Sequence, residues 1–266
     1  MQLGGKSYFW LEKTNVVSMI QEYQVSGFRV REYEELGSTN TETERVGWNE
    51  LEDKMVILTY RQTQGRGQVG NHWESEPGKN ISMTVVFKPR ELPAGQQFAV
   101  SMVIALGACD FISRYVSGCS VKWPNDIYVG DRKISGILIE HSIMGRYVGG
   151  SLCGIGVNIN QERFLSDAPN PVSLFQLIGE EIPVERALEE LLDCIEKRYE
   201  TIRDYEGLER DFLKVLYRRE GLYDWEDEEG MFRASVRGVN EFGQLILVDE
   251  KGTERVYGFK EVAYKF

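Results

Sequence analysis

Apolar positions along the chain fall into two patterns, which predict buried strands and amphipathic helices. Residues 55–60 are a short, mainly apolar run of the kind that forms a buried strand, and residues 81–87 predict another strand. From residue 96 to residue 116 the apolar positions recur at helical spacing, and Gly118 follows as a natural end to that helix. A second helix is predicted by the apolar set Leu188, Leu191, Leu192, Ile195, Tyr199 and Ile202, and a shorter one is expected over residues 208–217.

Further strands are predicted between and after these helices. Two β-like runs, 121–129 and 133–140, flank the turn residues 130–132, so we expect a hairpin there, and residues 147–157 predict another strand. After Gly221 the β-like runs become shorter and alternate with glycine-containing turns; they lie at 232–237, 244–248 and 255–257. This change predicts a small β-barrel-like domain of roughly 45 residues, near the lower size limit for independent folding.

The length of 266 residues fits one large domain with a small domain appended to it. We place the main domain at residues 35–219 and the C-terminal domain at residues 220–266. Residues 1–34 are mixed in character, and no role is assigned to them.

Charge and composition argue against several classes of protein. The formal net charge of −11 is not typical of a protein that tracks nucleic-acid phosphates. The four cysteines are far apart and the two histidines lack metal-ligand spacing, so we expect neither a disulfide framework nor a zinc site. No signal peptide is evident, and no apolar run approaches the ~18 residues that a membrane span needs. We therefore expect a cytoplasmic protein that binds neither nucleic acid nor membranes.

The most informative loop follows the strand at 55–60 and carries Gly65, Gly67 and Gly70 at the G-x-G-x-x-G spacing. Glycine allows the backbone to approach a ligand closely, and its N–H groups can surround an anion with Arg66 beside them. A dinucleotide-binding fold would need a helix at the third glycine, but turn residues and a strand follow instead. The kinase motifs that accompany a similar loop are also missing from the sequence. Taken alone, the loop is equally typical of a glycine-rich surface turn.

Cations and hydroxyl groups near predicted turns add to this candidate site. Arg66, Lys122 and Lys133 lie beside glycine or proline turns in an acidic chain, which suggests an anionic ligand. Each lysine alone is more typical of a solvated surface charge. Ser38 and Thr39 stand where a helix is expected to begin, so they either cap that helix or face a ligand.

Two carboxylates lie close to these lysines in the sequence. Asp126 is either a partner for an amine or a metal, or only a turn residue. Glu140 is best interpreted as an exposed strand end.

Several motifs, in this order and at this spacing, are similar to those of the biotin protein ligase family. They read Gln62…Gly65-Arg66-Gly67, Lys122-Trp123-Pro124-Asn125-Asp126, Lys133…Gly136-Ile137-Leu138-Ile139-Glu140 and Gly156-Val157-Asn158, and Ser38-Thr39-Asn40 precedes them. The second and third motifs together are highly specific. The resemblance covers about residues 33–262.

This resemblance implies a fold, a reaction and a set of partners. The fold is α+β, with a mixed β-sheet backed by helices as in class II aminoacyl-tRNA synthetases and lipoate ligases, and with a small SH3-like β-barrel at the C-terminus. In the implied reaction, the carboxylate of biotin attacks the α-phosphate of ATP to give biotinyl-5′-AMP and pyrophosphate. A lysine of a biotin carboxyl carrier protein then attacks the mixed anhydride and releases AMP. Mg²⁺ comes with ATP, and no metal cage built from protein side chains is implied.

The resemblance also implies roles for individual residues. Catalysis is implied for Arg66, Lys122 and Lys133, whose charges neutralise the reacting anions, and for Asp126, which orients the incoming lysine. Contacts with biotin are implied for Ser38, Thr39, Asn40, Gln62, Arg66, Gly67, Gln68, Trp123, Lys133 and Gly136, with Trp123 covering the apolar thiophane ring. Contacts with ATP or the adenylate are implied for Gly65, Arg66, Gly67, Lys122, Asn125 and Asn158.

The chain departs from the family pattern in two ways. Many relatives carry further basic residues in the glycine loop, whereas Gln68 can hydrogen-bond but carries no charge. The winged-helix domain of bifunctional members has no counterpart in these 266 residues, so we expect no operator binding. The alternatives are a lipoate–protein ligase and a paralogue that binds a ligand without turnover. Edge strands of the sheet make a homodimer plausible.

Overall fold

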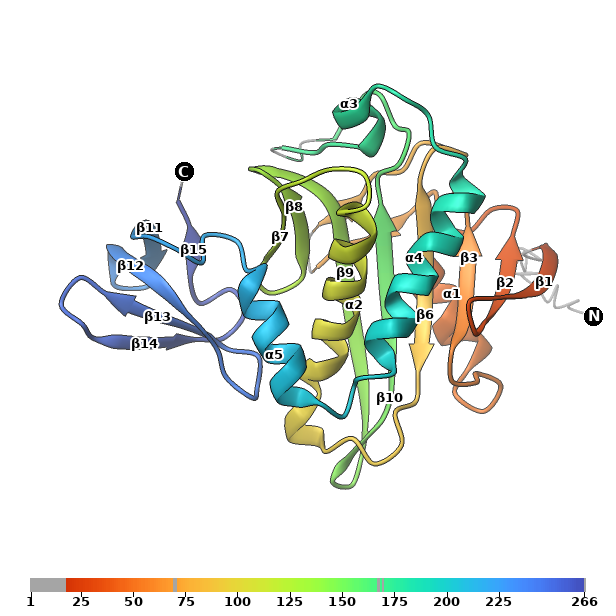
Figure 1. Ribbon diagram of the computed structural model, residues 1–266. Helices are drawn as coiled ribbons and strands as arrows, with labels where there is room; N and C mark the ends of the chain where they lie inside the picture. Colours follow the sequence, from red (N-terminus) through yellow and green to blue (C-terminus); the bar gives the residue numbers. More distant parts are fainter. Residues whose placement is uncertain (1–17, 69–70, 167, 169, 266) are drawn as a thin grey trace, which may run out of the picture.

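The computed structural model describes residues 18–68, 71–166, 168 and 170–265. Its centre is an eight-stranded sheet in the order β1-β2-β3-β6-β10-β9-β8-β7 (Figure 1). These strands are β1 (Met19–Val25), β2 (Phe28–Tyr33), β3 (Met55–Thr59), β6 (Ile81–Phe87), β7 (Cys119–Lys122), β8 (Asp126–Val129), β9 (Arg132–Met144) and β10 (Tyr147–Val157). Only the β2–β3 pair is parallel among these described strands, so the sheet is mixed.

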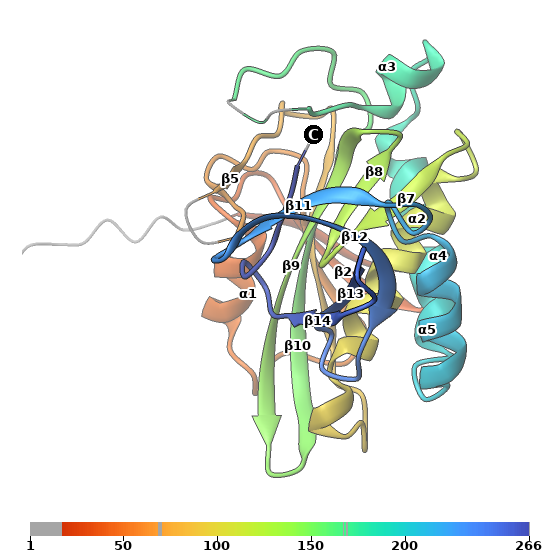
Figure 2. The same cartoon turned by 90° about the vertical axis from the view of Figure 1, so that its left-hand side faces the viewer.

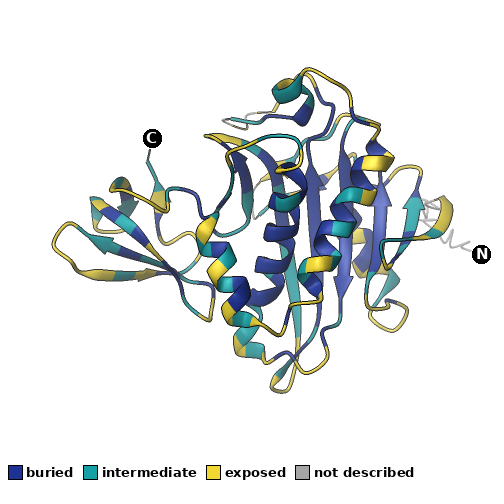
Figure 3. Ribbon diagram, in the orientation of Figure 1, coloured by how far each residue is buried: buried dark blue, intermediate teal, exposed yellow. Residues whose placement is uncertain are grey.

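One face of the sheet is covered by three helices: α2 (Phe98–Ile112), α4 (Val184–Tyr199) and α5 (Tyr205–Lys214) (Figure 1). The sides of α4 and α5 that face the sheet are buried and their outer sides are exposed (Figure 3). Every residue of β3 and β6 is buried, which explains why most of their side chains are apolar. The large core cluster fills the space between this sheet and the helices and continues into the C-terminal part of the chain.

Helix α2 shows why its sequence is so apolar. The segment Ala94–Ile112 is long and apolar enough to cross a membrane, but 72% of its most apolar window is buried inside the protein. It packs against α4, α5 and the strands β7, β8 and β9. Our expectation that no apolar segment reaches this length was wrong, and the burial of the helix in the core accounts for it.

The opposite face of the sheet carries α1 (Thr39–Val46) and the hairpin of β4 (Gly65–Arg66) and β5 (His72–Trp73) (Figure 2). Helix α1 contacts β3, β6 and β10. Because α1 is short and the hairpin is small, this face is only partly covered. A short helix, α3 (Leu174–Ile178), follows β10 along the chain.

The C-terminal part is a five-stranded antiparallel sheet in the order β14-β13-β12-β11-β15. Its strands are β11 (Tyr223–Asp227), β12 (Gly230–Val239), β13 (Leu245–Asp249), β14 (Glu254–Tyr257) and β15 (Ala263–Tyr264). Trp225, Leu245 and Leu247 are fully buried in its interior. This sheet lies beside β7, β8 and α5 (Figure 1). A hydrogen bond of 2.8 Å, from the Trp123 indole to the carbonyl oxygen of Gly243, joins the two parts.

The α+β fold with a β-rich C-terminal region is confirmed, and so are the strands at 81–87 and 147–157 and the two long helices. The predicted strand over 121–129 is in fact two strands, β7 and β8, because Pro124 lacks an N–H group and cannot continue the ladder. The hairpin of β1 and β2 was not predicted. Strand β1 lies at the sheet edge and is mostly exposed, so its residues lack the apolar alternation of a half-buried strand.

Candidate functional site

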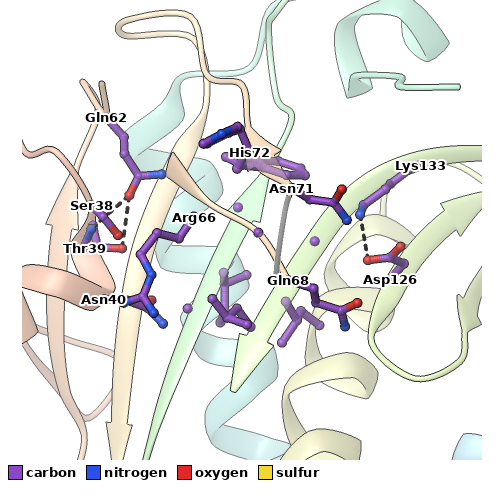
Figure 4. A pocket seen from close by; sticks show the side chains of 18 residues that line it. Ser38, Thr39, Asn40, Gln62, Arg66, Gln68, Asn71, His72, Asp126 and Lys133 are labelled. Carbon is purple, nitrogen blue, oxygen red and sulfur yellow. Dashed lines mark hydrogen bonds and ion pairs between the residues drawn. The ribbon is translucent and has the colours of Figure 1, made fainter. Parts of the chain in front are cut away.

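A cavity opens on the face of the sheet that carries α1 and the β4–β5 hairpin (Figure 4). Most of the predicted site residues line it: Ser38, Thr39, Asn40, Gln62, Arg66, Gly67, Gln68, Asp126, Lys133 and Gly136. The remaining lining residues are Asn71, His72, Trp73, Ile137, Leu138, Gly154, Ile155 and Gly156. Segments that are far apart in the sequence therefore meet at one place.

Glycines on β9 and β10 leave room for two larger side chains on the floor of the cavity. A Cβ atom at Gly154 would overlap the Asn40 amide, and one at Gly156 would overlap the Trp73 indole. A Cβ atom at Gly136 would lie only 3.0 Å from the same indole. The shape of the cavity thus depends on positions that have no side chain.

The start of α1 forms a polar wall. Ser38 is the N-cap residue by position, as predicted, but its side chain makes no capping hydrogen bond. The backbone N–H of Thr39 donates to Gln62 Oε1 at 2.9 Å. Asn40 Nδ2 donates to Glu140 Oε2 at 3.1 Å. This wall therefore combines hydroxyl, amide and carboxylate groups within one short stretch of the cavity.

Arg66 enters the cavity from the β4–β5 hairpin, where it pairs with His72 across the ladder. Its guanidinium lies 2.8 Å from Glu44 Oε1 and 3.2 Å from Glu140 Oε1. The hydrogen bond with Glu44 is the main cause that raises the pKa of Arg66. All three side chains are partly exposed, so both ion pairs are weakened by solvent. An anionic ligand can therefore compete for Arg66.

Lys133 lies on the other side of the cavity (Figure 4). Its Nζ forms an ion pair of 2.7 Å with Asp126 Oδ1, because β8 and β9 are neighbours in the sheet. The same Nζ is 5.9 Å from the centre of the Trp73 ring. The site thus holds two cations on opposite sides of one floor.

Gln68 connects the glycine loop to the turn between β7 and β8. Its Nε2 donates to Asn125 Oδ1 at 2.9 Å, and Asn125 Nδ2 in turn donates to the backbone carbonyl of Ile137. The link uses neutral amides only. The third glycine of the loop, Gly70, lies outside the described residues.

Lys122 does not line the cavity. Its Nζ is 3.1 Å from the Tyr128 hydroxyl and 5.0 Å from the ring centre of Tyr264, which comes from β15. Burial lowers the pKa of Lys122, and the nearby Asp126 carboxylate partly opposes that shift. The C-terminal sheet thus supplies part of the surroundings of Lys122.

Four other predicted site residues also do not line the cavity. Trp123 is 5% exposed and packs against the C-terminal sheet, with its ring 6.5 Å from Phe259, so its position does not fit a role in covering a ligand in this cavity. Asn158 is buried, and its Oδ1 has no hydrogen-bond partner within the described residues. Gly65 is buried at the base of the hairpin, where its backbone lies against Trp73. Asn125 does not line the cavity itself but accepts a hydrogen bond from Gln68, which does.

Sequence reasoning missed Trp73 and underrated Glu140. The Trp73 indole lies on Gly136 and Gly156, and among the described residues its buried Nε1 has no partner. A signal for it existed, because Gly136 and Gly156 face each other across β9 and β10 and leave a space that only a large side chain fills. Glu140 was interpreted as a strand end, but it contacts both Arg66 and Asn40.

Metal ligands are not concentrated at this cavity. Within residues 18–68, 71–166, 168 and 170–265, no three His, Cys, Asp or Glu side chains come together in a way that could hold a metal ion. What the cavity offers is a pair of cations for an anionic group and a polar wall for an uncharged group with donors and acceptors.

Three comparisons with known proteins agree with this arrangement. Residues 34–158 match the model of the biotin/lipoate A/B protein ligase family. The bifunctional ligase/repressor BirA of Bacillus subtilis is 26% identical over 245 residues, which are 88% of this chain and 74% of that protein. The biotin–[acetyl-CoA-carboxylase] ligase of Paracoccus denitrificans is 32% identical over 124 residues, which are 46% of this chain and 51% of that protein.

A solved structure shares the fold. The biotin protein ligase from Aquifex aeolicus in complex with biotin and ATP has a TM-score of 0.73 and 22% identity, over 89% of this chain and 98% of that chain. At this identity the likeness establishes the fold alone.

Proposed function

We propose that the protein is an ATP-dependent biotin protein ligase, because residues 34–158 match the model of the biotin/lipoate A/B protein ligase family. It forms biotinyl-5′-AMP from biotin and ATP, and it then transfers biotin to a lysine of a biotin carboxyl carrier protein. The names of the relatives from Bacillus subtilis and Paracoccus denitrificans support this choice within the family. The structural observation that carries the proposal is that Arg66 and Lys133 flank one cavity with a polar wall.

In the first step, a carboxylate oxygen of biotin bonds to the α-phosphorus of ATP, and the bond to the pyrophosphate oxygen breaks. Both reactants are anions, so cations must lower their repulsion. Arg66 leaves Glu44 and Glu140 for the phosphate, since those exposed ion pairs are weak. Lys133, held in place by Asp126, faces the carboxylate and later the acyl oxygen.

Mg²⁺ enters this proposal together with ATP, where it lowers the charge of the phosphates. The described residues contribute no carboxylate cage for it. Asn158 is the residue that we assign to the phosphates or their metal, because its buried Oδ1 has no partner in the part of the chain that the structure describes. Lys122 is assigned to the triphosphate side.

In the second step, the amine of the carrier lysine attacks the acyl carbon and AMP leaves. That amine must lose a proton, and Asp126 is the carboxylate that lines the cavity at Lys133. We assign to Asp126 the role of orienting the amine and receiving the proton. The polar wall of Ser38, Thr39 and Gln62 holds the ureido ring of biotin, which needs both donors and acceptors.

One assay tests the proposal directly. ATP–pyrophosphate exchange by the purified protein is expected to depend on biotin and not on lipoate. If exchange depended on lipoate and not on biotin, the protein would be a lipoate ligase rather than a biotin ligase. No exchange with either acid would favour a paralogue that binds a ligand without turnover.

The proposal also covers the cellular compartment, nucleic-acid binding and oligomeric state of the protein. We assign it to the cytoplasm, and we expect no binding to nucleic acid because the net charge is −11. A sequence-specific, salt-dependent gel shift of DNA by the purified protein would contradict this. A homodimer stays a prediction, which light scattering with and without biotin and ATP decides.

Substitution of Trp73 and of Trp123 is expected to separate ligand binding from packing against the C-terminal sheet. Trp73→Leu should weaken biotin binding by about tenfold or more, since it removes apolar area from the cavity and burial of a large apolar side chain contributes ~1.5–3 kcal/mol. Trp123→Leu should leave biotin binding within a factor of about two and lower the melting temperature, because its ring packs on the C-terminal sheet. Titration calorimetry and thermal melts measure both effects. If Trp123→Leu weakened biotin binding and Trp73→Leu did not, the contact with the ligand would be assigned to Trp123.

Gln68 is expected to limit how long the adenylate is retained. Gln68→Arg adds a charge beside the phosphate, and a charge-assisted hydrogen bond of ~1.5–3 kcal/mol should slow dissociation of biotinyl-5′-AMP about tenfold or more. Gln68→Glu is the matched control and should speed dissociation. Release of radiolabelled adenylate from the isolated complex measures the rate. If Gln68→Arg left the rate unchanged or raised it, position 68 would not be where charge is missing.

Lys122 is expected to set the alkaline limit of the reaction. Because burial lowers its pKa, Lys122 loses its proton at a lower pH than an exposed lysine does. The kcat/KM for ATP should therefore fall as pH rises through this lowered pKa. Lys122→Arg keeps its charge and should move the alkaline limb to higher pH. The surface variant Lys79→Arg is the control, and an unmoved limb in Lys122→Arg would assign the titration to another group.

A further inference from the structure

Two cysteines meet where helix α2 packs against strand β7. The sulfurs of Cys109 and Cys119 are 3.0 Å apart, although the two residues come from different elements. A water molecule or another side chain does not fit between atoms at this separation. A disulfide bond has an S–S length of about 2.0 Å, so the sulfurs need to approach each other by only about 1 Å.

The two thiols differ in how a reagent can reach them. Cys109 is 2% exposed on the buried helix α2, whereas Cys119 is partly exposed at the start of β7, which is an edge strand of the main sheet. The hydrogen bond with Cys119, followed by burial, raises the pKa of Cys109 well above its usual value. Cys119 is therefore the sulfur that meets a reagent first, and Cys109 is held directly behind it.

The other two cysteines provide a contrast. Cys153 is fully buried in β10, and Cys194 is 3% exposed in α4. Burial raises the pKa of Cys153, and it also raises that of Cys194. A reagent reaches neither thiol unless the core opens.

We propose that Cys109 and Cys119 form a thiol–disulfide exchange site for small disulfides such as oxidised glutathione. The thiolate of Cys119 attacks one sulfur of the glutathione disulfide, forms a mixed disulfide and releases one glutathione thiolate. Cys109 then loses its proton to the released glutathione thiolate, and the Cys109 thiolate attacks Cys119 Sγ, which forms the protein disulfide and releases the second glutathione thiolate. The two protein thiol protons end on the two glutathione molecules, so one disulfide is reduced while one is formed.

The bond would join the core helix to the strand that leads to Lys122. Cys119 and Lys122 are the two ends of β7, and Lys122 pairs with Asp126 in the ladder of β7 and β8. The cross-link closes a loop with a sequence separation of 10 residues and so restricts the unfolded chain. The oxidised protein is therefore more stable than the reduced one, and its β7–β8 hairpin is held against α2.

The test uses the full-length protein in glutathione buffers of increasing oxidised fraction, without biotin or ATP. Free thiols are then blocked with N-ethylmaleimide, and peptides are mapped by mass spectrometry without reduction. The expected result is a Cys109–Cys119 cross-link with a mass loss of about 2 Da, and a melting temperature several degrees higher that reverts with dithiothreitol. The result does not depend on ligase activity, so it stands or fails separately from the proposed function.

Three alanine variants make the assignment specific, since alanine fits the volume of a small buried cysteine. Cys109→Ala is expected to trap the mixed disulfide, with one glutathione on Cys119. Cys119→Ala should take up no glutathione, and Cys194→Ala should form the cross-link as the wild type does. Circular dichroism shows that each variant is folded. A folded wild type that keeps all its thiols under oxidising conditions, or a cross-link through Cys153 or Cys194, would overturn the proposal.

Discussion

Lys133→Met is expected to lower biotin-dependent ATP–pyrophosphate exchange by about 10²–10³-fold, the cost of removing one preorganised group that stabilises charge in the transition state. Methionine keeps most of the length and apolar stem of the side chain but removes the charge that faces the reacting carboxylate. It also leaves Asp126 without its 2.7 Å ion pair, so a carboxylate then repels the anions in the cavity. The loss should appear in kcat more than in the KM for biotin, because the charge matters most as the acyl phosphate forms.

A matched control distinguishes this effect from a general loss of charge. Lys79 forms an ion pair of 2.6 Å with Glu181 at the surface, and neither residue lines the cavity. Lys79→Met should leave the exchange rate within about twofold, since exposed ion pairs contribute little. Equal losses in the two variants, or a full rate in Lys133→Met, would remove Lys133 from the catalytic role.

Gly154→Ala is expected to abolish most of the biotin binding although it adds only one methyl group. That methyl group would overlap the Asn40 amide, so Asn40 must swing into the cavity. Asn40 then loses the hydrogen bond that its Nδ2 donates to Glu140 and the one of 2.7 Å that its Oδ1 accepts from Thr84 Oγ1. Leaving the buried Asn40 and Thr84 groups unpaired costs about 1–3 kcal/mol each, so we expect biotin affinity to fall at least tenfold and the melting temperature to fall by several degrees.

The control for added volume is Gly95→Ala. A Cβ atom at Gly95 meets only the Phe242 ring, at an ordinary 4.0 Å, and neither this glycine nor Gly154 needs a left-handed backbone. Gly95→Ala should therefore keep both biotin affinity and stability. Calorimetric titration with biotin and a thermal melt of each variant provide the comparison. Unchanged binding in Gly154→Ala would show that Asn40 is not part of the biotin site.

The local patterns in the sequence were sufficient to predict many of the strands and helices of the fold. Strand β3 was predictable because burial on both faces favours an apolar run, β6 and β10 were predictable from their β-like runs, and α2 and α4 were predictable from helical spacing. The start of α1 followed from its capping residues. Strand β1 was not predictable, because an exposed edge strand needs no apolar face.

The candidate site, like the fold, was only partly predictable from the sequence. Motif residues such as Arg66 and Lys133 were identifiable from the sequence, because each motif lies within one short segment beside a turn. Which of them share a cavity was not identifiable. Trp123 and Lys122 are next to each other in the sequence, yet both face the C-terminal sheet rather than the cavity floor.

The sequence by itself determined the buried strands, the two long helices and the types of residue at the site, because these depend on local spacing and on short motifs. The tertiary structure alone decided that Trp73, and not Trp123, covers the cavity floor, and that Cys109 lies against Cys119. These contacts depend on where the β4–β5 hairpin crosses Gly136 and Gly156, and on how α2 packs on β7. A side chain's direction is set by the packing of elements that are distant in the sequence, and no local pattern contains that information.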